Sequence, residues 1–339
     1  MGSALAAGLI GAALAGCQPA ADETPAEEVG DTANGAAIAD ITVTAAFEPV
    51  EGGVLAVDFV PDTNTPWAGL IVTAPRDGGL DFYNADGESV TRVTGSRLTS
   101  LAVAPNFALR GEALPLILGV DTQSGGVRGY VLLRSGPDAI EAPLSPIVLD
   151  GGAAALCFVR EGAGFVEIAV LGREAVAEVW RISDNGGDLI GAERVRAIRL
   201  DGPARTCASM DGALFVSGPT TSITRIESGS GTGVQAGYNA LSLAAGVIAG
   251  RPVLLASNGE DDTLRSFDAR TLQPLAPVRI IDGLSTPGID RPGALAISEV
   301  SFGGASYQSG LIAAVDEADG RVRVVARESF ARDLTLATN

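Results

Sequence analysis

The fold is decided by a short pattern whose first clear copy, residues 69–83, reads GLIVTAPRDGGLDFY. It consists of a buried apolar strand, a polar turn that contains glycine, and a second strand in which apolar and polar residues alternate. Later copies occupy residues 114–130, 165–180, 213–226, 252–267 and 310–325. Between the equivalent residues Ile71 and Ile312 the pattern recurs at a spacing of about 48 residues.

A repeat of about 40 to 50 residues with several strands in each unit is typical of propeller blades. We therefore predict an all-β fold, a six-bladed β-propeller formed by residues 41–339. The alternative is a pair of β-sandwiches, whose strands recur at about 8–12 residues but lack the longer period. After residue 40 the sequence shows no long helical periodicity, and short apolar runs end in Gly, Asp and Asn clusters.

The composition excludes several kinds of chemistry. The chain has 339 residues and a formal net charge of -18, and all 23 of its basic residues are arginine. Without histidine there is no Ser-His-Asp or Cys-His catalysis and no histidine-ligated metal. Without lysine there is no Schiff base and no P-loop. The acidic balance argues against nucleic acid as a partner, because phosphate backbones require positive contacts.

The first residues predict export. Residues 1–16 form an apolar run that contains no charged residue and is shorter than the roughly 20 residues of a spanning helix. We interpret them as a signal peptide. The segment ends in Leu14-Ala15-Gly16-Cys17, which resembles the lipobox of bacterial lipoproteins. This resemblance implies lipidation of Cys17 and a lipid anchor in the bacterial cell envelope, in the periplasm or the outer membrane. The alternative is a simple signal peptide with a chance cysteine.

Residues 17–40 are predicted to be an acidic tether. From Gln18 to Asp40 the segment contains six acidic residues and no basic residue, with prolines among small side chains. It cannot bury enough apolar surface to fold, and we expect it to remain solvated and disordered.

Cys157 and Cys207 remain once Cys17 is assigned to lipidation. Both lie in strand-like apolar stretches. In an exported protein, two remaining cysteines suggest a disulfide, and two buried free thiols are the alternative.

Several segments resemble the β-propeller phytases. The resemblance rests on residues 70–88, which resemble the first blade of that family, on residues 168–198, which resemble the third, and on Leu254-Leu255-Ala256-Ser257-Asn258-Gly259. It covers about residues 50–330. The surroundings of Cys157 and Cys207 resemble positions where many members carry a cysteine pair. The resemblance implies a six-bladed propeller and calcium-dependent hydrolysis of phytate, myo-inositol hexakisphosphate.

The family's chemistry needs carboxylates that hold calcium at one face of the propeller, and basic side chains that bind phosphates. Arg76 and Arg173 stand where the family has phosphate-binding lysines, and Asp316 matches an acidic residue of the sixth blade. Other matched positions depart from the pattern. Arg205 replaces a family glutamate. Other expected carboxylate positions fall on Gly53-Val54-Leu55, Asn239-Ala240 and Pro292-Gly293.

Two functions therefore remain open, and no catalytic residue is assigned. The first is an enzyme, a 3-phytase-like phosphoric monoester hydrolase that uses calcium. The second is a non-catalytic envelope propeller that binds an anionic ligand or a protein partner. In the second interpretation Arg76, Arg173 and Arg205 bind an inositol phosphate or another anionic small molecule.

Overall fold

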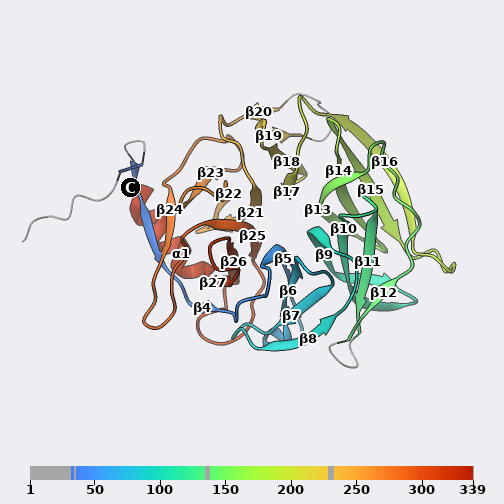
Figure 1. The fold of residues 1–339 in the computed structure, drawn as a ribbon, viewed down its shortest axis with the longest axis horizontal. Coiled ribbons are helices and arrows are strands. Elements are labelled where there is room, and N and C mark those ends of the chain that lie inside the picture. Colours follow the sequence, from blue (N-terminus) through green and yellow to red (C-terminus); the bar gives the residue numbers. More distant parts are fainter. Residues whose placement is uncertain (1–31, 34–35, 134–137, 228–232, 339) are drawn as a thin grey trace, which may run out of the picture. The chain divides into compact units, whose positions relative to one another are not determined.

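The computed structural model describes residues 32–33, 36–133, 138–227 and 233–338. In this part of the chain, six sheets surround a common axis as the blades of a propeller, which confirms the predicted fold class (Figure 1). The first strands of successive blades contact one another in chain order, and that of blade 6 contacts that of blade 1.

Each blade begins with its innermost strand and continues outward. Blade 1 contains β5 (Val54–Val60), β6 (Leu70–Pro75), β7 (Leu80–Tyr83) and β8 (Ser89–Val93). Blade 2 contains β9 (Leu98–Leu109), β10 (Glu112–Asp121), β11 (Val127–Leu132) and β12 (Ala139–Ala142). Blade 3 contains β13 (Ala153–Gly162), β14 (Phe165–Gly172), β15 (Val176–Ser183) and β16 (Gly191–Arg199). Blade 4 contains β17 (Thr206–Met210), β18 (Ala213–Gly218), β19 (Thr221–Ile226) and β20 (Val234–Gln235).

The last two blades are completed by segments from the start of the described chain. Blade 5 contains β21 (Ser242–Ile248), β22 (Arg251–Ser257), β23 (Thr263–Asp268), β24 (Val278–Ile281) and β3 (Ala39–Thr42). Blade 6 contains β25 (Pro292–Ser298), β26 (Leu311–Asp316), β27 (Val322–Ala326) and β4 (Ala45–Ala46). The remaining elements are β1 (Thr32–Ala33), β2 (Ala36–Ala37), the 3-10 turn η1 (Pro66–Ala68) and helix α1 (Arg327–Thr338).

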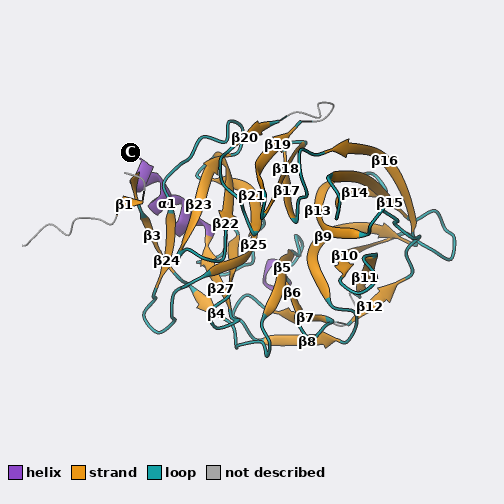
Figure 2. Ribbon diagram, turned by 45° about the horizontal axis from the view of Figure 1, so that its top comes forward, coloured by secondary structure: helices purple, strands orange, loops and turns teal. Residues whose placement is uncertain are grey.

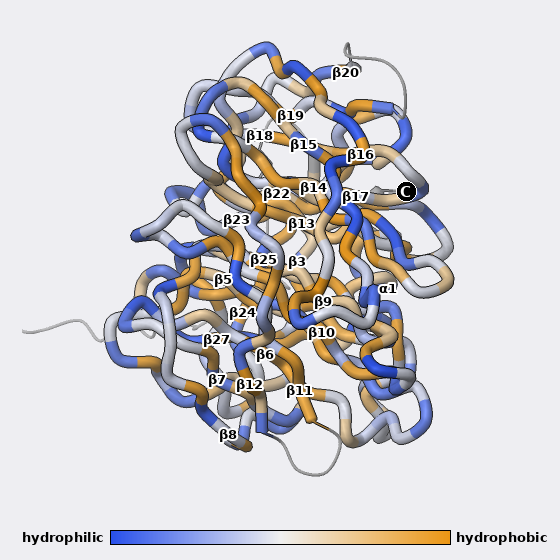
Figure 3. Tube along the Cα trace, turned by 90° about the vertical axis from the view of Figure 1, so that its right-hand side faces the viewer, coloured by the Kyte–Doolittle hydropathy of each residue, from blue (hydrophilic) through white to orange (hydrophobic). Residues whose placement is uncertain are grey.

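The hydrophobic core is divided among the junctions between neighbouring blades. Each of six buried clusters in the described residues combines side chains of two adjacent blades. The second strands β6, β18 and β26 are buried along their whole length, since both of their faces are covered by neighbouring blades. Figure 3 shows the hydrophobic residues mainly in the strands inside the molecule and the hydrophilic residues mainly in the turns at their ends.

The ring is closed by β3 and β4. β4 pairs antiparallel with β27, and β3 pairs parallel with β24 (Figure 2). In β3 the alternation fits an outer strand, because Ala39 and Ile41 are buried whereas Asp40 is exposed and binds Arg279 at 2.9 Å. The predicted tether boundary at residue 40 is therefore too late, since β3 already belongs to the propeller. Cys17 and the rest of residues 1–31 lie outside the described residues.

Helix α1 was not predicted from the sequence. It follows β27 directly and packs against β3 and β21 through the buried side chains of Phe330 and Leu334 (Figure 2). No helix among the described residues has the length and apolar character needed to cross a membrane.

The innermost strands are joined laterally at several junctions. At three junctions a backbone N–H of one blade donates to a side-chain hydroxyl of the preceding blade. The pairs are Leu156 with Ser100, Leu243 with Thr206, and Leu295 with Ser242. Between β13 and β17 the joint is covalent. Cys157 and Cys207 form the expected disulfide, with a Cα–Cα distance of 5.8 Å.

Replacing both Cys157 and Cys207 by alanine should lower the free energy of unfolding. The disulfide closes a loop with a sequence separation of 50 residues, for which chain entropy gives about 4 kcal/mol. Urea unfolding of both proteins, with and without a thiol reductant, measures this difference. The reductant should destabilise the native sequence and leave the double variant unchanged; equal stability of the two oxidised proteins would contradict the expectation.

Candidate functional site

A large cavity opens at the centre of the ring, on the face where the innermost strands begin. We call this the mouth face. The cavity has a volume of about 1220 Å³ and is lined by the first residues of β5, β9, β13, β17, β21 and β25. All six blades contribute to its wall, so its lining depends on closure of the whole ring.

A second cavity of about 310 Å³ lies toward the opposite end of the same strands. The two cavities share an apolar ring of lining residues, namely Val57, Leu101, Cys207, Leu243 and Leu295. This ring separates a polar mouth from the far end of the axis, and the disulfide forms part of it.

Two of the three predicted anion-binding arginines line the mouth cavity. Arg205 immediately precedes β17, is exposed, and has no ion-pair or side-chain hydrogen-bond partner among the described residues. Arg76 follows β6 and forms an ion pair with Glu317 at 2.9 Å. Arg205 therefore has no counter-charge among the described residues, whereas Arg76 is partly neutralised by Glu317.

The sequence analysis missed Arg291. It precedes β25, lines the same cavity and donates to the backbone carbonyl of Glu317 at 3.0 Å. The signal was present, because Arg291 directly precedes Pro292-Gly293, one of the positions that the resemblance matches to a family carboxylate.

Arg173 lies outside the mouth cavity. It follows β14 at the junction of blades 2 and 3, and its backbone N–H donates to Gly152 at 3.0 Å. Its exposed guanidinium lies above Gly125 and Gly152, with Nη2 3.8 Å from the point that a Cβ on Gly125 would occupy. The structure thus brings Arg76 and Arg205 to one cavity and places Arg173 at another position on the mouth face.

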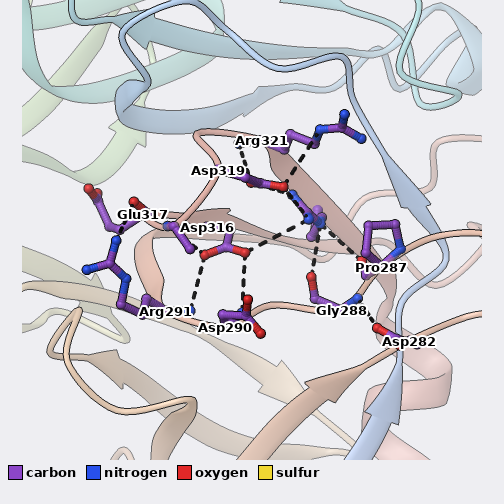
Figure 4. A network of polar contacts seen from close by, with 11 residues as sticks. Asp282, Pro287, Gly288, Asp290, Arg291, Asp316, Glu317, Asp319 and Arg321 are labelled. Carbon is purple, nitrogen blue, oxygen red and sulfur yellow. Dashed lines mark hydrogen bonds and ion pairs between the residues drawn. The ribbon is translucent and has the colours of Figure 1, made fainter.

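Asp316 has a structural environment. Its carboxylate accepts hydrogen bonds from the backbone N–H groups of Arg291 at 3.1 Å and Ala318 at 2.9 Å, and a longer one from Asp290 (Figure 4). The side chain is almost fully buried and lies 3.9 Å from the guanidinium of Arg323. These contacts use the oxygens that would otherwise be free for a metal ion.

The mouth does not provide a donor set suited to calcium. Calcium requires about six to eight oxygen ligands, several of them carboxylates. The carboxylates that line the cavity are Glu260 and Glu317, and Glu317 already binds Arg76. Among the described residues, no three His, Cys, Asp or Glu side chains gather where they could hold a metal ion.

Asp58 is the unusual ionisable group of the second cavity. It lies in β5, and its carboxylate accepts hydrogen bonds from Phe59 at 2.8 Å and from Val103 of the next blade at 3.1 Å. Burial raises the pKa of Asp58 to about 7, although these two N–H groups pull it downward. This property could not be predicted from the sequence, because Asp58 stands in an ordinary strand pattern.

The raised pKa of Asp58 predicts a loss of stability as the pH rises from about 4 to about 7. In this range the folded protein holds a proton on Asp58, whereas the unfolded chain has released it. Raising the pH therefore favours unfolding, by at most about 4 kcal/mol for this group. Replacement by asparagine should remove this contribution. Chemical unfolding of the native protein and the Asp58→Asn variant at pH 5 and pH 8 measures how the free energy of unfolding depends on pH. The same pH dependence in both proteins would contradict the raised pKa of Asp58.

Comparison with known proteins yields similarity at the level of structure. No protein-family model matches the sequence, and no curated protein matches it. A crystal structure of BBS1N in complex with ARL6DN, soaked with lead, is 13% identical, with 80% of this chain and 79% of that chain covered and a TM-score of 0.49. The mercury-soaked form is 11% identical, with 76% and 73% covered and a TM-score of 0.47. Saccharomyces cerevisiae Sqt1 is 11% identical, with 84% and 99% covered and a TM-score of 0.47. Similarity at these values carries no argument about function.

Proposed function

We propose that this protein is a non-catalytic β-propeller that binds an anionic small molecule in the mouth cavity. The observation that carries the proposal is Arg205, an exposed guanidinium without a partner among the described residues, on the wall of a cavity of about 1220 Å³. A guanidinium offers planar, paired donors that suit carboxylates and phosphates.

The charge of the lining supports an anionic ligand. Three arginines and two glutamates line the cavity, in a chain whose formal net charge is -18. The lining therefore carries a small excess of positive charge, whereas the chain as a whole is strongly negative. A cleft with such an excess attracts anions, and its low-dielectric walls strengthen the attraction.

Neutral polar groups supply the rest of the binding surface. Thr99, Ser222, Asn239 and Asn258 line the cavity, and they offer hydroxyl and amide groups beside the arginines. Asn239 is held in place by a hydrogen bond to the carbonyl of Pro219 at 2.9 Å. This combination fits a ligand that carries hydroxyl groups as well as negative charge.

The resemblance to β-propeller phytases makes inositol phosphates the first anions to test. The same resemblance implies calcium-dependent hydrolysis, but the carboxylates of the mouth do not fit calcium. We therefore propose binding without turnover, and derive no catalytic step.

We also propose that the protein is exported and held at the cell envelope by a lipid on Cys17. The lipobox-like Leu14-Ala15-Gly16-Cys17 supports this proposal. The Cys157–Cys207 disulfide supports it independently, because stable disulfides are typical of proteins in oxidising compartments.

Replacing Arg205 by glutamine should weaken binding of inositol hexakisphosphate by at least about tenfold, because a charge-assisted contact is lost. Arg291→Gln should have a similar effect. Arg270→Gln is the matched control, since it removes an equal charge from an exposed turn outside the cavity. Isothermal titration calorimetry at fixed ionic strength measures the affinities. Equal affinity of the Arg205→Gln and Arg270→Gln variants would contradict the proposal.

A phosphate-release assay on the same samples tests the absence of turnover. We expect no phosphate from inositol hexakisphosphate, with or without millimolar calcium. Phosphate released only with calcium would establish the enzyme instead.

Replacing Cys17 by serine should abolish acyl labelling and move the protein from the membrane fraction to the soluble fraction. Metabolic labelling with a fatty acid, followed by fractionation of a bacterial host, measures both. The Cys157→Ala, Cys207→Ala variant is the control, because it removes cysteines that the proposal does not assign to lipidation. Unlabelled native protein in the soluble fraction would overturn the proposed anchor.

A further inference from the structure

We infer that Arg97, Thr122 and Arg173 form a second binding site, which takes a carboxylate group of an external ligand. The site lies at the junction of blades 2 and 3, on the mouth face, and none of the three residues lines the mouth cavity. A structural element that occurs twice in the ring carries this inference. Both copies begin with an aspartate, and in one copy a further carboxylate, that of Glu317, binds an arginine of the next blade.

The repeated element begins with an aspartate at the end of a second strand. Asp121 ends β10, and its carboxylate accepts from the N–H of Gln123 at 2.9 Å, while the N–H of Gly125 donates to its carbonyl at 2.8 Å. Asp316 ends β26 and makes the same two bonds with Ala318 at 2.9 Å and Gly320 at 2.8 Å.

The similarity extends to the next strand of each blade. Asp121 lies 3.5 Å from Arg128, and Asp316 lies 3.9 Å from Arg323, an arginine at the same offset in sequence. The two turns therefore share these backbone hydrogen bonds and an aspartate–arginine contact, although Arg323 is buried whereas Arg128 is partly exposed.

An arginine of the following blade covers each turn. Gly125 approaches Gly152 of blade 3 so closely that a Cβ on Gly125 would lie 3.3 Å from the Gly152 Cα. In the same way, a Cβ on Gly320 would lie 3.0 Å from the Gly53 Cα of blade 1. All four glycines have a positive φ, which glycine adopts without strain.

At each of these close contacts between glycines, an arginine side chain lies against the backbone. Arg173 lies above Gly125 and Gly152. Arg76 lies beside Gly53, with its Nε 3.4 Å from the point that a Cβ on Gly53 would occupy. The backbone N–H of Arg173 donates to the carbonyl of Gly152, and that of Arg76 donates to the carbonyl of Gly53, each at 3.0 Å.

A second arginine precedes the blade that contains each turn. The carbonyl of Arg97 accepts from the N–H of Thr122 at 2.9 Å, and the carbonyl of Arg291 accepts from the N–H of Glu317 at 2.8 Å. Arg97, Thr122 and Arg173 therefore occupy the same backbone positions as Arg291, Glu317 and Arg76.

The two copies differ at one decisive position. Glu317 provides a carboxylate that binds Arg76 at 2.9 Å, whereas Thr122 ends in a short hydroxyl. Arg97 and Arg173 are both exposed, and neither has an ion-pair partner among the described residues. The copy at blades 2 and 3 thus has the two arginines of the other copy and lacks its carboxylate.

Glu317 indicates which ligand the open copy takes. Its carboxylate reaches Arg76 from a side chain, so a carboxylate on a flexible external group can reach Arg173 in the same way. Charge-assisted hydrogen bonds of this kind are stronger than those between neutral groups. The nearby Glu174 and Asp150 are exposed and carry negative charge, so the site should select a small carboxylate over a multiply charged anion.

The test exchanges the decisive residues. Thr122→Glu should supply an internal carboxylate and close the site at blades 2 and 3. Glu317→Thr should remove the internal carboxylate and open an equivalent site at blades 6 and 1. The probe is N-acetyl-glutamate amide, which carries only the side-chain carboxylate, and N-acetyl-glutamine amide is its neutral control.

Arginine Nε–Hε resonances of the full-length protein measure binding. In the native sequence, N-acetyl-glutamate amide should shift the Arg173 resonance, while the glutamine analogue should not. Thr122→Glu should weaken this binding at least about tenfold. Arg173→Gln should weaken it to a similar degree, and in that variant the Arg97 resonance reports binding. Glu317→Thr should add a second titration that shifts Arg76.

Three results would overturn the inference: no carboxylate-dependent shift of Arg173, an unchanged affinity in Thr122→Glu, or inorganic phosphate bound more tightly than the glutamate probe. Thermal unfolding identifies any variant that fails to fold. In that case Arg173→Gln alone decides, with the Arg97 resonance as the readout, because Arg173 is exposed and its replacement should not disturb folding.

This site is independent of the proposed function of the mouth. Arg205→Gln should leave the Arg173 titration unchanged, and Thr122→Glu should leave binding of inositol hexakisphosphate at the mouth unchanged. Failure of either proposal is therefore distinguishable from failure of the other.

Discussion

Ring closure is the constraint on which the rest of the structure depends. The six sheets bury most of their faces against one another, so blade 6 must contact blade 1 before either has a complete core. β4 fixes this contact by pairing with β27, and the chain then runs directly into β5 of blade 1. β3 adds a second connection, on blade 5. β3 and β4 thereby join the beginning of the described chain to the last two blades.

A buried arginine supports the same junction. Arg323 of β27 is 1% exposed and binds Asp319 at 2.7 and 2.9 Å, with Pro287 and Gly288 carbonyls as further acceptors. A buried charge is tolerated only where its donors are satisfied, as they are here. Because Arg323 also lies near Asp316, the network fixes the turn that presents Glu317 to Arg76 (Figure 4). Closure of the ring and geometry of the mouth therefore depend on the same group of side chains.

The sequence predicted the repeat well because each blade repeats a local pattern of strand and turn. Blade number follows from that periodicity. The disulfide was inferred from the two cysteines that remain in a chain predicted to be exported, and Arg76 and Arg205 were assigned to anion binding through the resemblance to β-propeller phytases. The pairing of β3 and β4 with the last two blades could not be predicted from the sequence. Both strands are short, and they lie in a region of small residues next to the acidic segment. Helix α1 escaped notice because its two buried anchors, Phe330 and Leu334, are too few to establish a period. Arg173 was assigned to the mouth because sequence position does not show that the blades place equivalent residues around a ring. The raised pKa of Asp58 depends on burial, which the sequence pattern does not reveal.

The distribution of arginine connects the fold to function. In blades 1, 2, 3 and 6, the residue before the innermost strand accepts a hydrogen bond from the residue after the second strand. The four pairs are Gly53 with Arg76, Arg97 with Thr122, Gly152 with Arg173, and Arg291 with Glu317. An arginine stands in every pair, so the positions that complete each blade also direct positive charge toward the mouth face. At one of these junctions Glu317 pairs with Arg76. Arg97 and Arg173 have no ion-pair partner among the described residues, which is why we propose that they bind an external carboxylate. In an acidic chain without lysine or histidine, these four pairs, together with Arg205 before β17, place arginine side chains on the mouth face.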